Sequence, residues 1–274
     1  MRLLAVCSVV LAACGGGGGW VQAAVLPNGS VDCRSVLLVG DALFVGNDHG
    51  LAKSPDDGLT WAEATNGLPH PSGFSPVEAL LQDQDALLAG TDDGIYASMD
   101  NAATWVNASA GFPTDVGRTG GLFRSPDQGV SWAMSSTGLS QSDGAISFAQ
   151  LGSKVFTCFG MTVSSSTDQG QTWTVSASPG SSNCLWLATD GSSWSAASKG
   201  LPTGDIVSTL FFDTGKLYAG TDQNGVFVSS DSGKSWSKFS QGFGATLPRV
   251  VQFAIHGTTL IAITTANGVW RRPL

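Results

Sequence analysis

The side chains best suited to chemistry in this sequence lie in a set of short turns rich in Asp, Asn and Gly. Six of them are candidates for ligand binding, namely Asp48, His49, Asp92, Asp93, Asp222 and Asn224. Two carboxylates that face each other across a cleft can act together on a glycosidic bond. Carboxylates and amides arranged in a ring can also bind a ligand or a cation. The alternative is that Asp-Gly and Asn-Gly pairs only form tight turns here.

The irregular segment 69–74 adds two further candidates for ligand contact, His70 and Phe74. It is the longest irregular insert expected on the same side of the molecule as the Asp-rich turns. The sequence contains no Ser-His-Asp order, no phosphate-binding loop and no HExxH zinc motif. The catalytic residues, if there are any, are therefore unknown, and no cofactor or metal site is expected.

Each Asp-rich turn lies between two short apolar runs. The runs 42–46, 86–90 and 216–220 precede the turns, and further runs begin at Gly50, Gly94 and Gly225. Short alternating runs bounded by Gly, Asn and Asp are typical of β-hairpins. Four antiparallel strands, named a to d, form one unit of about 40 residues, which is the size of a propeller blade. The sequence therefore predicts an all-β fold, a β-propeller of four-stranded blades.

A second turn, between strands c and d, carries the pattern S-x-D-x-G-x-[S/T]-W in five copies. The Ser and Asp side chains are expected to bond backbone groups of their own turn, and Gly to supply a positive φ. The Trp is expected to pack on the neighbouring blade. Ala102 replaces Gly in the second copy, which predicts a strained or differently shaped turn. The residues assigned this structural role are Ser54, Asp56, Gly58, Trp61, Ser98, Asp100, Trp105, Ser125, Asp127, Gly129, Trp132, Ser166, Asp168, Gly170, Trp173, Ser229, Asp231, Gly233 and Trp236.

This pattern resembles the Asp-box, or BNR, repeat of sialidase-like β-propellers, and the resemblance covers nearly the whole chain after the N-terminal segment. It implies that ligands bind on the face opposite the boxes. The repeats are also similar to those of photosystem II assembly factors, which act as non-catalytic scaffolds. The basic contact patch of those factors has no visible counterpart in this sequence.

The sialidase resemblance implies three Arg residues that clamp a carboxylate, a Tyr–Glu pair and an acid Asp. The only tyrosines are Tyr96 and Tyr218, at strand positions that are apolar in other units, and the only glutamates are Glu63 and Glu78. Such a pair is hard to assemble from these residues. We therefore favour a non-catalytic binding or scaffold module for a protein or a glycan. The alternative is an exo-sialidase-like glycoside hydrolase that acts on the face opposite the boxes.

Tryptophan spacing predicts the number of blades. Successive gaps between Trp61, Trp105, Trp132, Trp173, Trp194 and Trp236 are 44, 27, 41, 21 and 42 residues. Three gaps match a full blade, whereas the gaps of 27 and 21 predict shortened units. With Trp20 included, the sequence predicts six or seven blades, one or two of them incomplete. The C-terminal segment supplies strands a to c of the last blade, and the N-terminal segment 20–27 is expected to pair with it and complete the ring.

The N-terminal segment indicates export. Arg2 is followed by a short apolar run and then by Leu11-Ala12-Ala13-Cys14, which resembles a bacterial lipobox. We expect residues 1–13 to be a signal peptide, residues 14–19 to be a lipidated Cys14 with a Gly tether, and residues 20–274 to be the propeller domain. The expected location is the cell envelope, lipid-anchored at the outer membrane, in the periplasm or at the cell surface. An ordinary signal peptide is the alternative.

Composition limits the possible partners. The 274 residues carry a formal net charge of −8 at pH 7, and only 12% of them are charged. An acidic domain is a poor binder of nucleic acid, and the membrane contact is expected only through the lipid. A monomer with a protein or carbohydrate partner is expected. Three cysteines follow the lipobox, Cys33, Cys158 and Cys184. A disulfide between Cys158 and Cys184 is one possibility, and three buried thiols are the alternative.

Overall fold

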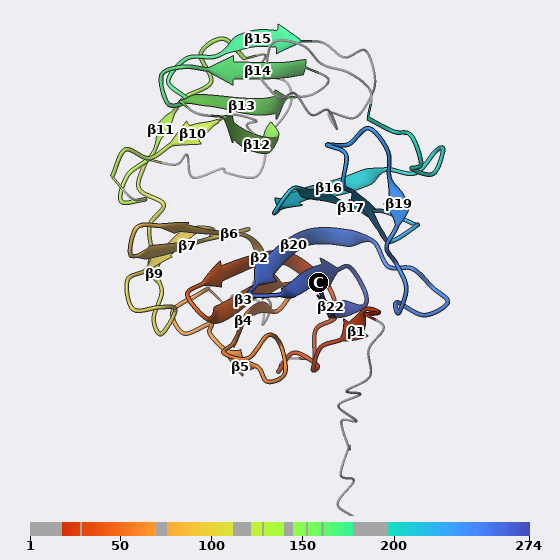
Figure 1. Cartoon of the computed structure of the whole chain (residues 1–274). Coiled ribbons are helices and arrows are strands. Elements are labelled where there is room, and N and C mark those ends of the chain that lie inside the picture. The colour runs from red at the N-terminus through yellow and green to blue at the C-terminus, as the bar shows by residue number, and fades with distance from the viewer. Residues whose placement is uncertain are drawn as a thin grey trace, which may run out of the picture.

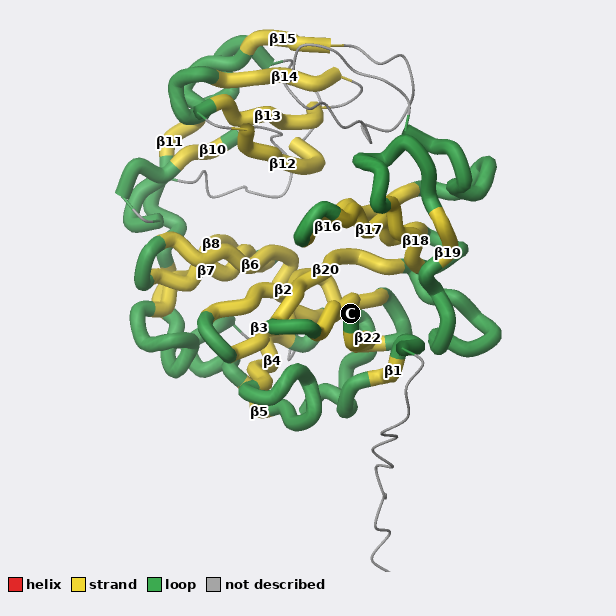
Figure 2. The backbone as a smooth tube through the Cα atoms, viewed as in Figure 1, coloured by secondary structure: helices red, strands yellow, loops and turns green. Residues whose placement is uncertain are grey.

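The described part of the chain consists of strands joined by turns and loops (Figures 1 and 2). The structure is a computed structural model. It describes residues 18–27, 29–69, 76–111, 122–127, 129–139, 145–151, 153–159, 162–177 and 197–274. No helix among these residues is long and apolar enough to span a membrane. The all-β prediction is confirmed.

Five four-stranded antiparallel sheets form the blades. The first two are β2 (Cys33–Val39), β3 (Ala42–Asn47), β4 (Gly50–Ser54) and β5 (Ala62–Glu63), then β6 (Val77–Asp83), β7 (Ala86–Thr91), β8 (Gly94–Ser98) and β9 (Val106–Asn107). The next two are β12 (Ala145–Leu151), β13 (Lys154–Phe159), β14 (Thr162–Ser166) and β15 (Thr174–Ala177), then β16 (Val207–Asp213), β17 (Lys216–Thr221), β18 (Val226–Ser229) and β19 (Ser237–Lys238). The last contains β20 (Val250–His256), β21 (Thr259–Thr264), β22 (Gly268–Pro273) and the N-terminal β1 (Val21–Gln22).

The prediction of six or seven blades is wrong for the residues that the structure describes, since they form five. The shortened unit that ends at Trp132 is a two-stranded sheet of β10 (Phe123–Arg124) and β11 (Ala133–Met134). Strands c and d of a blade are present there, but the chain before β10 is too short to add strands a and b. The second shortened unit, with Trp194, lies outside the described residues.

Strand β1 pairs with β22, and this is the pairing predicted for the two end segments. Val21 lies opposite Arg271 and Gln22 opposite Trp270 in antiparallel register. The strand is only two residues long, and its side chains are exposed. The residue before it, Trp20, is 2% exposed and stacks on Phe243 with ring centroids 4.8 Å apart. The N-terminal segment is therefore held mainly by its tryptophan.

The innermost strand of each four-stranded sheet is its strand a, and these strands are β2, β6, β12, β16 and β20. The sheets are set around a common centre (Figure 1). Strand β2 contacts both β6 and β20, and β20 also contacts β16. The apolar core lies between neighbouring blades. One cluster joins Leu43 and Val45 to Ile261 and Val269, and a second joins the first blade to the next through Phe44 and neighbouring residues. The first blade is therefore stabilised by burial against both of its neighbours.

The five S-x-D-x-G-x-[S/T]-W segments form one kind of turn, called the repeated turn below. In the first copy, Ser54 donates to the Asp56 carboxylate (2.8 Å) and accepts from the Gly58 N–H (2.8 Å). The other Asp56 oxygen accepts from the Thr60 hydroxyl at 2.6 Å. Ala102 keeps the same bond, from its N–H to Ser98 at 2.9 Å, and adopts a φ of +65°. That turn therefore keeps its shape, and an Ala occupies a left-handed conformation that favours Gly.

Five of the described tryptophans are bonded to the loop that follows the preceding unit. The Trp105 N–H donates to the Asn66 carbonyl (2.9 Å), and its indole N–H donates to the Ala64 carbonyl (2.8 Å). Trp20, Trp132, Trp173 and Trp236 make the same two kinds of bond. Trp61 is the exception, because its buried indole N–H has no hydrogen-bond partner. The contact between the last and first blades is therefore built differently from the others.

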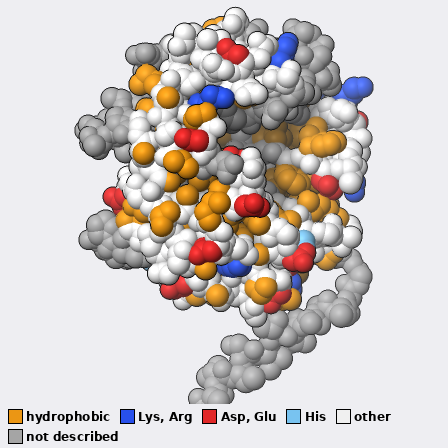
Figure 3. Space-filling model, turned by 90° about the vertical axis from the view of Figure 1, so that its left-hand side faces the viewer, with side chains coloured by type: hydrophobic (Ala, Val, Ile, Leu, Met, Phe, Trp, Pro, Cys, Tyr) orange, Lys and Arg blue, Asp and Glu red, His pale blue; other side chains and the backbone are white. Residues whose placement is uncertain are grey.

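The surface mixes acidic and apolar side chains. Figure 3 shows the side of the molecule on which β9 and β11 lie, and apolar side chains there are interspersed with acidic ones. Exposed apolar residues of these strands and the turns before them are Met99, Val106, Val130 and Met134.

Candidate functional site

The candidate turns lie at the ends of the strands opposite the repeated turns. Strand β4 runs from the turn 47–50 to the repeated turn at Ser54, and β8 runs from the turn 91–94 to the repeated turn at Ser98. The same holds for β18 and the turn 221–225. We call the face formed by these turns, together with the loops that lead into each first strand, the loop face.

Asp48 and His49 form a local pair in the turn between β3 and β4. His49 Nδ1 lies 2.9 Å from the Asp48 carboxylate, which also accepts a hydrogen bond from the Ser30 hydroxyl. Partial burial of Asp48 opposes its ionisation, but the bonds from Ser30 and His49 outweigh it and lower the pKa of the carboxyl below its usual range. An ionised, fully bonded carboxylate is suited to fixing the turn and is a poor proton donor.

Asp92 and Asp93 lie exposed in the turn between β7 and β8. The Asp93 N–H donates to the Thr91 hydroxyl at 3.2 Å, which is a turn-forming contact. The two remaining candidates from the sequence, His70 and Phe74, lie outside the described residues.

Asp222 and Asn224 are held by residues from two different loops. Arg249 Nε lies 3.0 Å from the Asp222 carboxylate, and the Asn224 amide donates to Asp205 at 2.7 Å. Burial raises the pKa of Asp205, but the hydrogen bonds from Asn224 and Thr221 outweigh this and lower it overall. Asp205 lies in the loop before β16, and Arg249 lies in the loop before β20. The turn is thereby fixed to both neighbouring loops, by an ion pair to Arg249 and by a charge-assisted hydrogen bond to Asp205.

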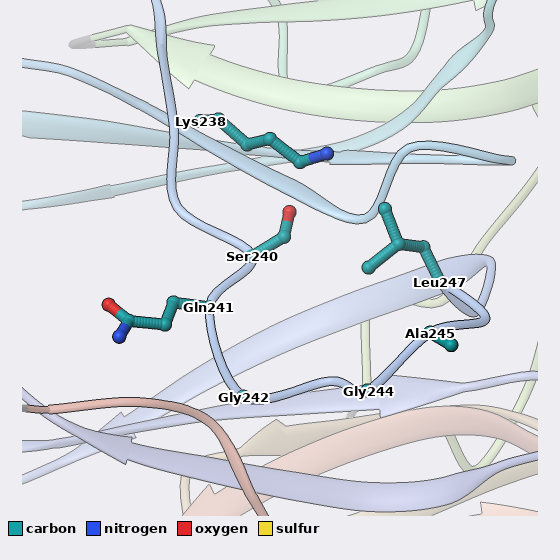
Figure 4. Close-up of a pocket in the computed structure, with 7 residues that line it drawn as sticks. All are labelled: Lys238, Ser240, Gln241, Gly242, Gly244, Ala245 and Leu247. Atoms are coloured by element: carbon teal, nitrogen blue, oxygen red, sulfur yellow. The ribbon is translucent and has the colours of Figure 1, made fainter.

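A groove of about 460 Å³ lies beside this turn and is called the loop-face groove (Figure 4). Lys238 and Ser240 extend from one wall, Leu247 faces them, and the Gln241 side chain points away. The backbone of Gly242 contributes to the floor. A Cβ at Gly242 would lie 2.3 Å from the Trp20 backbone nitrogen, so the floor packs directly on the N-terminal segment. The remaining lining residues are Gly244 and Ala245.

The groove and the turn form one continuous surface. The Ser240 hydroxyl donates to the Asn224 carbonyl at 3.1 Å, and it accepts from the Val226 N–H at 2.9 Å. The available chemistry is one ammonium group, exposed backbone amides and an apolar wall. These groups can bind an extended polar chain through hydrogen bonds and one charge. Asp222 is already paired with Arg249, and Asp205 with Asn224.

Sequence patterns did not single out Arg249, Asp205, Lys238 or Leu247 as site residues. All four lie in, or next to, loops without periodicity, and only the fold brings them to the turn 221–225. The one available signal was position, since each precedes or follows a recognisable strand.

Cys33 carries a buried thiol, and burial raises the pKa of this thiol to about 12. It is therefore a packing residue and no nucleophile.

Comparisons with known proteins identify the fold. No family model and no curated protein matches the sequence. The chain is similar to the structure of YCF48 from Cyanidioschyzon merolae, with 11% identity over 93% of this chain and 98% of that chain and a TM-score of 0.67. It is also similar to the structure of YCF48 bound to a D1 peptide, with 11% identity, 94% of each chain covered and a TM-score of 0.70. The extracellular domain of BT4673 from B. thetaiotaomicron aligns with 13% identity over 92% of this chain and 39% of that chain, with a TM-score of 0.71. At these identities the comparisons establish the β-propeller fold alone.

Proposed function

We propose that this propeller is a non-catalytic binding or scaffold module that holds a segment of a protein, or a glycan, on the loop face. The observation that carries the proposal is the continuity of the loop-face groove with the turn 221–225. That turn is fixed by Arg249 on one side and Asp205 on the other. A surface whose polar groups are already fixed loses little freedom on binding, which favours affinity.

Charge distribution supports a partner with acidic character. Residues 197–274 contain seven Lys and Arg and four Asp, a formal charge of +3, whereas the whole chain carries −8. Lys238 lies in this region and lines the groove. Complementary charge increases the rate of encounter and fixes the orientation of a partner. The similarity to YCF48, which has been solved with a bound D1 peptide, supports a peptide segment as the occupant.

We further propose that the chain is an Asp-box propeller of the cell envelope. The repeated turns support membership of the Asp-box class, and the segment ending at Cys14 supports lipidation and attachment to a membrane. The pairing of β1 with β22 supports a ring completed by the two end segments. We propose that the anchored molecule is a monomer, since the outer strands of propeller blades are short edges that pair poorly with another chain.

A site-specific crosslinker tests the binding proposal. A photoreactive amino acid at Ala245, which lines the groove, should capture a partner in intact cells, and this partner is then identified and purified. The affinity of the purified partner for the full chain is then measured by calorimetry. Lys238→Glu and Leu247→Ala should each weaken binding about tenfold, since each removes one charged or one apolar contact.

Lys216→Glu is the matched control, because Lys216 lies at the start of β17, at the opposite end of the blade. It changes the net charge as much as Lys238→Glu does and should leave the affinity unchanged. Equal effects of the two Lys variants would contradict the groove as the site. Turnover of a chromogenic glycoside that is lost on mutating a paired carboxylate would contradict the non-catalytic role. For the anchor, Cys14→Ser should abolish incorporation of labelled palmitate.

A further inference from the structure

A second cavity, of about 380 Å³, lies between β6 and β7 on one side and β10 and β13 on the other. Its apolar lining includes Leu81, Leu88, Phe123, Trp132, Val155 and Trp173. Gly129 and Gly170 of two repeated turns also line it, so it opens on the face opposite the loop face. We call it the box-side cavity. It is separate from the groove described above.

Chain length explains why this cavity exists. Between β5 and β8 the chain has thirty residues, 64–93, which supply a loop and the two inner strands β6 and β7. Between β9 and β10 it has fifteen residues, 108–122. Strands β6 and β7 with their turn occupy fifteen residues by themselves, 77–91. The unit of β10 and β11 therefore has no length for a loop and two inner strands, and the space beside them is bordered by neighbouring blades.

Arg124 gives the cavity one cationic group. Its Nη2 lies 3.4 Å from the Gln169 amide oxygen, a long contact with a neutral acceptor, and both residues line the cavity. None of the ion pairs among the described residues includes Arg124. A guanidinium has five N–H donors, so most of them remain available to a ligand. Asp83 lines the same cavity and makes it unfavourable for a ligand with two negative charges.

We propose that the box-side cavity binds a small carboxylic acid with an apolar body, an aryl- or alkyl-carboxylate. Leu81, Val155 and the two tryptophans would enclose the body, and Arg124 would pair with the carboxylate. A planar guanidinium matches a carboxylate in a two-point hydrogen-bonded pair. The volume lies within the range of about 300–1,000 Å³ typical of sites for small ligands, which are mostly apolar with a few polar groups.

Calorimetry on the purified full chain tests this with three matched probes. They are 4-phenylbutanoate, the neutral 4-phenylbutanamide and the dianionic 3-phenylpropyl phosphate. The acid should bind about tenfold more tightly than the amide, as expected for one charge-assisted pair. The phosphate should bind more weakly than the acid. Equal affinity of acid and amide, tighter binding of the phosphate, or no binding of the acid at millimolar concentration would each overturn the proposal.

Two variants and one control locate the site. Arg124→Gln should remove the preference for the acid and leave the affinity for the amide unchanged, while the control Arg271→Gln in β22 should change neither. Leu81→Trp should weaken the binding of the acid and of the amide alike, because the larger side chain fills the cavity. Since Leu81 is 56% exposed, the chain should still fold. Thermal melting of each variant verifies folding. An acid preference that persists in Arg124→Gln would place the carboxylate elsewhere and overturn the assignment.

Discussion

Gly67 shows how closely each blade approaches the next one. A Cβ at this position would lie 2.2 Å from the Trp105 carbonyl oxygen, and the residue has a φ of +93°. Gly111, Gly138 and Gly200 have equivalent contacts with the tryptophans that follow them. The backbone of each connecting loop therefore lies directly against a tryptophan, and the two hydrogen bonds from that tryptophan depend on this approach.

Gly67→Ala should lower the free energy of unfolding by about 2 kcal/mol more than Gly215→Ala does. The two residues have similar positive φ values, +93° and +85°, so the cost of placing Ala in that conformation, about 1–2 kcal/mol, is shared. Only Gly67 adds overpacking, which costs about 1–3 kcal/mol. No atom lies within 4 Å of a Cβ at Gly215. Urea unfolding of both variants measures the difference, and equal losses would show that the approach to Trp105 is easily relaxed.

The aspartates of the repeated turns should make the protein sensitive to acid. Hydrogen bonds from Thr104 and Ser98 lower the pKa of Asp100 to about 2, and those from Ser235 and Ser229 lower that of Asp231 to about 2. Since these pKa values are depressed in the folded state, the stabilisation is fully present above about pH 4 and is lost as the pH falls toward 2. Thermal melting between pH 5 and pH 2 should show this loss.

Asp100→Asn should be less stable than the wild type at pH 5 and should lose less stability on acidification. Asp93→Asn is the control, because the Asp93 side chain makes no hydrogen bond among the described residues. An identical acid response in Asp100→Asn and the wild type would mean that other groups govern the transition.

Among the elements, the contact between the last and first blades stands apart. Trp61 lacks the indole bond that the tryptophans of the other four repeated turns make, and His256, the last residue of β20, bridges the two blades instead. Its Nδ1 lies 2.6 Å from Asp57, and its Nε2 lies 3.3 Å from Asp41. A neutral imidazole has only one N–H, so both carboxylates are satisfied only by the protonated ring.

Stability should therefore fall as the pH rises above neutrality. Hydrogen bonds to Asp57 and then to Asp41 raise the pKa of His256 above its usual value. A raised folded-state pKa gives stabilisation that is complete below the unfolded pKa, about 6.5, and that is lost as the pH rises through the folded value. Thermal melting across this range should show the loss in the wild type. His256→Gln should abolish it, whereas Asp83→Asn, at the equivalent position of β6, should preserve it.

At the scale of the whole molecule, the fold was predictable because residues close in the sequence determine each repeated hairpin and turn. Gly-bounded alternating runs specify hairpins, and the S-x-D-x-G turn fixes its own geometry through Ser and Asp. The number of blades was not predictable in the same way. A tryptophan marks the outer strand of a unit but carries no information about its inner strands, so the unit of Trp132 counts as a blade in the sequence and has two strands in the structure.

The candidate site was predictable only in part. The turn residues Asp222 and Asn224 follow from the repeat, but their partners Arg249 and Asp205 lie in connecting loops. Loop positions have no periodicity, and the bond between Asn224 and Asp205, 19 residues apart, depends on how the loop before β16 folds back onto its own blade. The bond between His256 and Asp57 spans 199 residues and follows only from the meeting of the first and last blades.

The proposed completion of the ring by the end segments depends on Trp20. Its indole N–H donates to the Phe239 carbonyl (2.7 Å), and its backbone N–H donates to the Gln241 carbonyl (2.7 Å). Removing residues 20–27 should lower the melting temperature by about 10 °C or more, since loss of a buried Trp costs about 3–5 kcal/mol and each kcal/mol shifts a domain of this size by about 2–4 °C. Trp20→Phe should cost less than the deletion, about 2 kcal/mol, because it loses the indole bond and part of the buried ring but keeps an aromatic side chain there. Val21→Ala should be near neutral because Val21 is 56% exposed. An unchanged melting temperature after the deletion would show that β1 is dispensable to the ring.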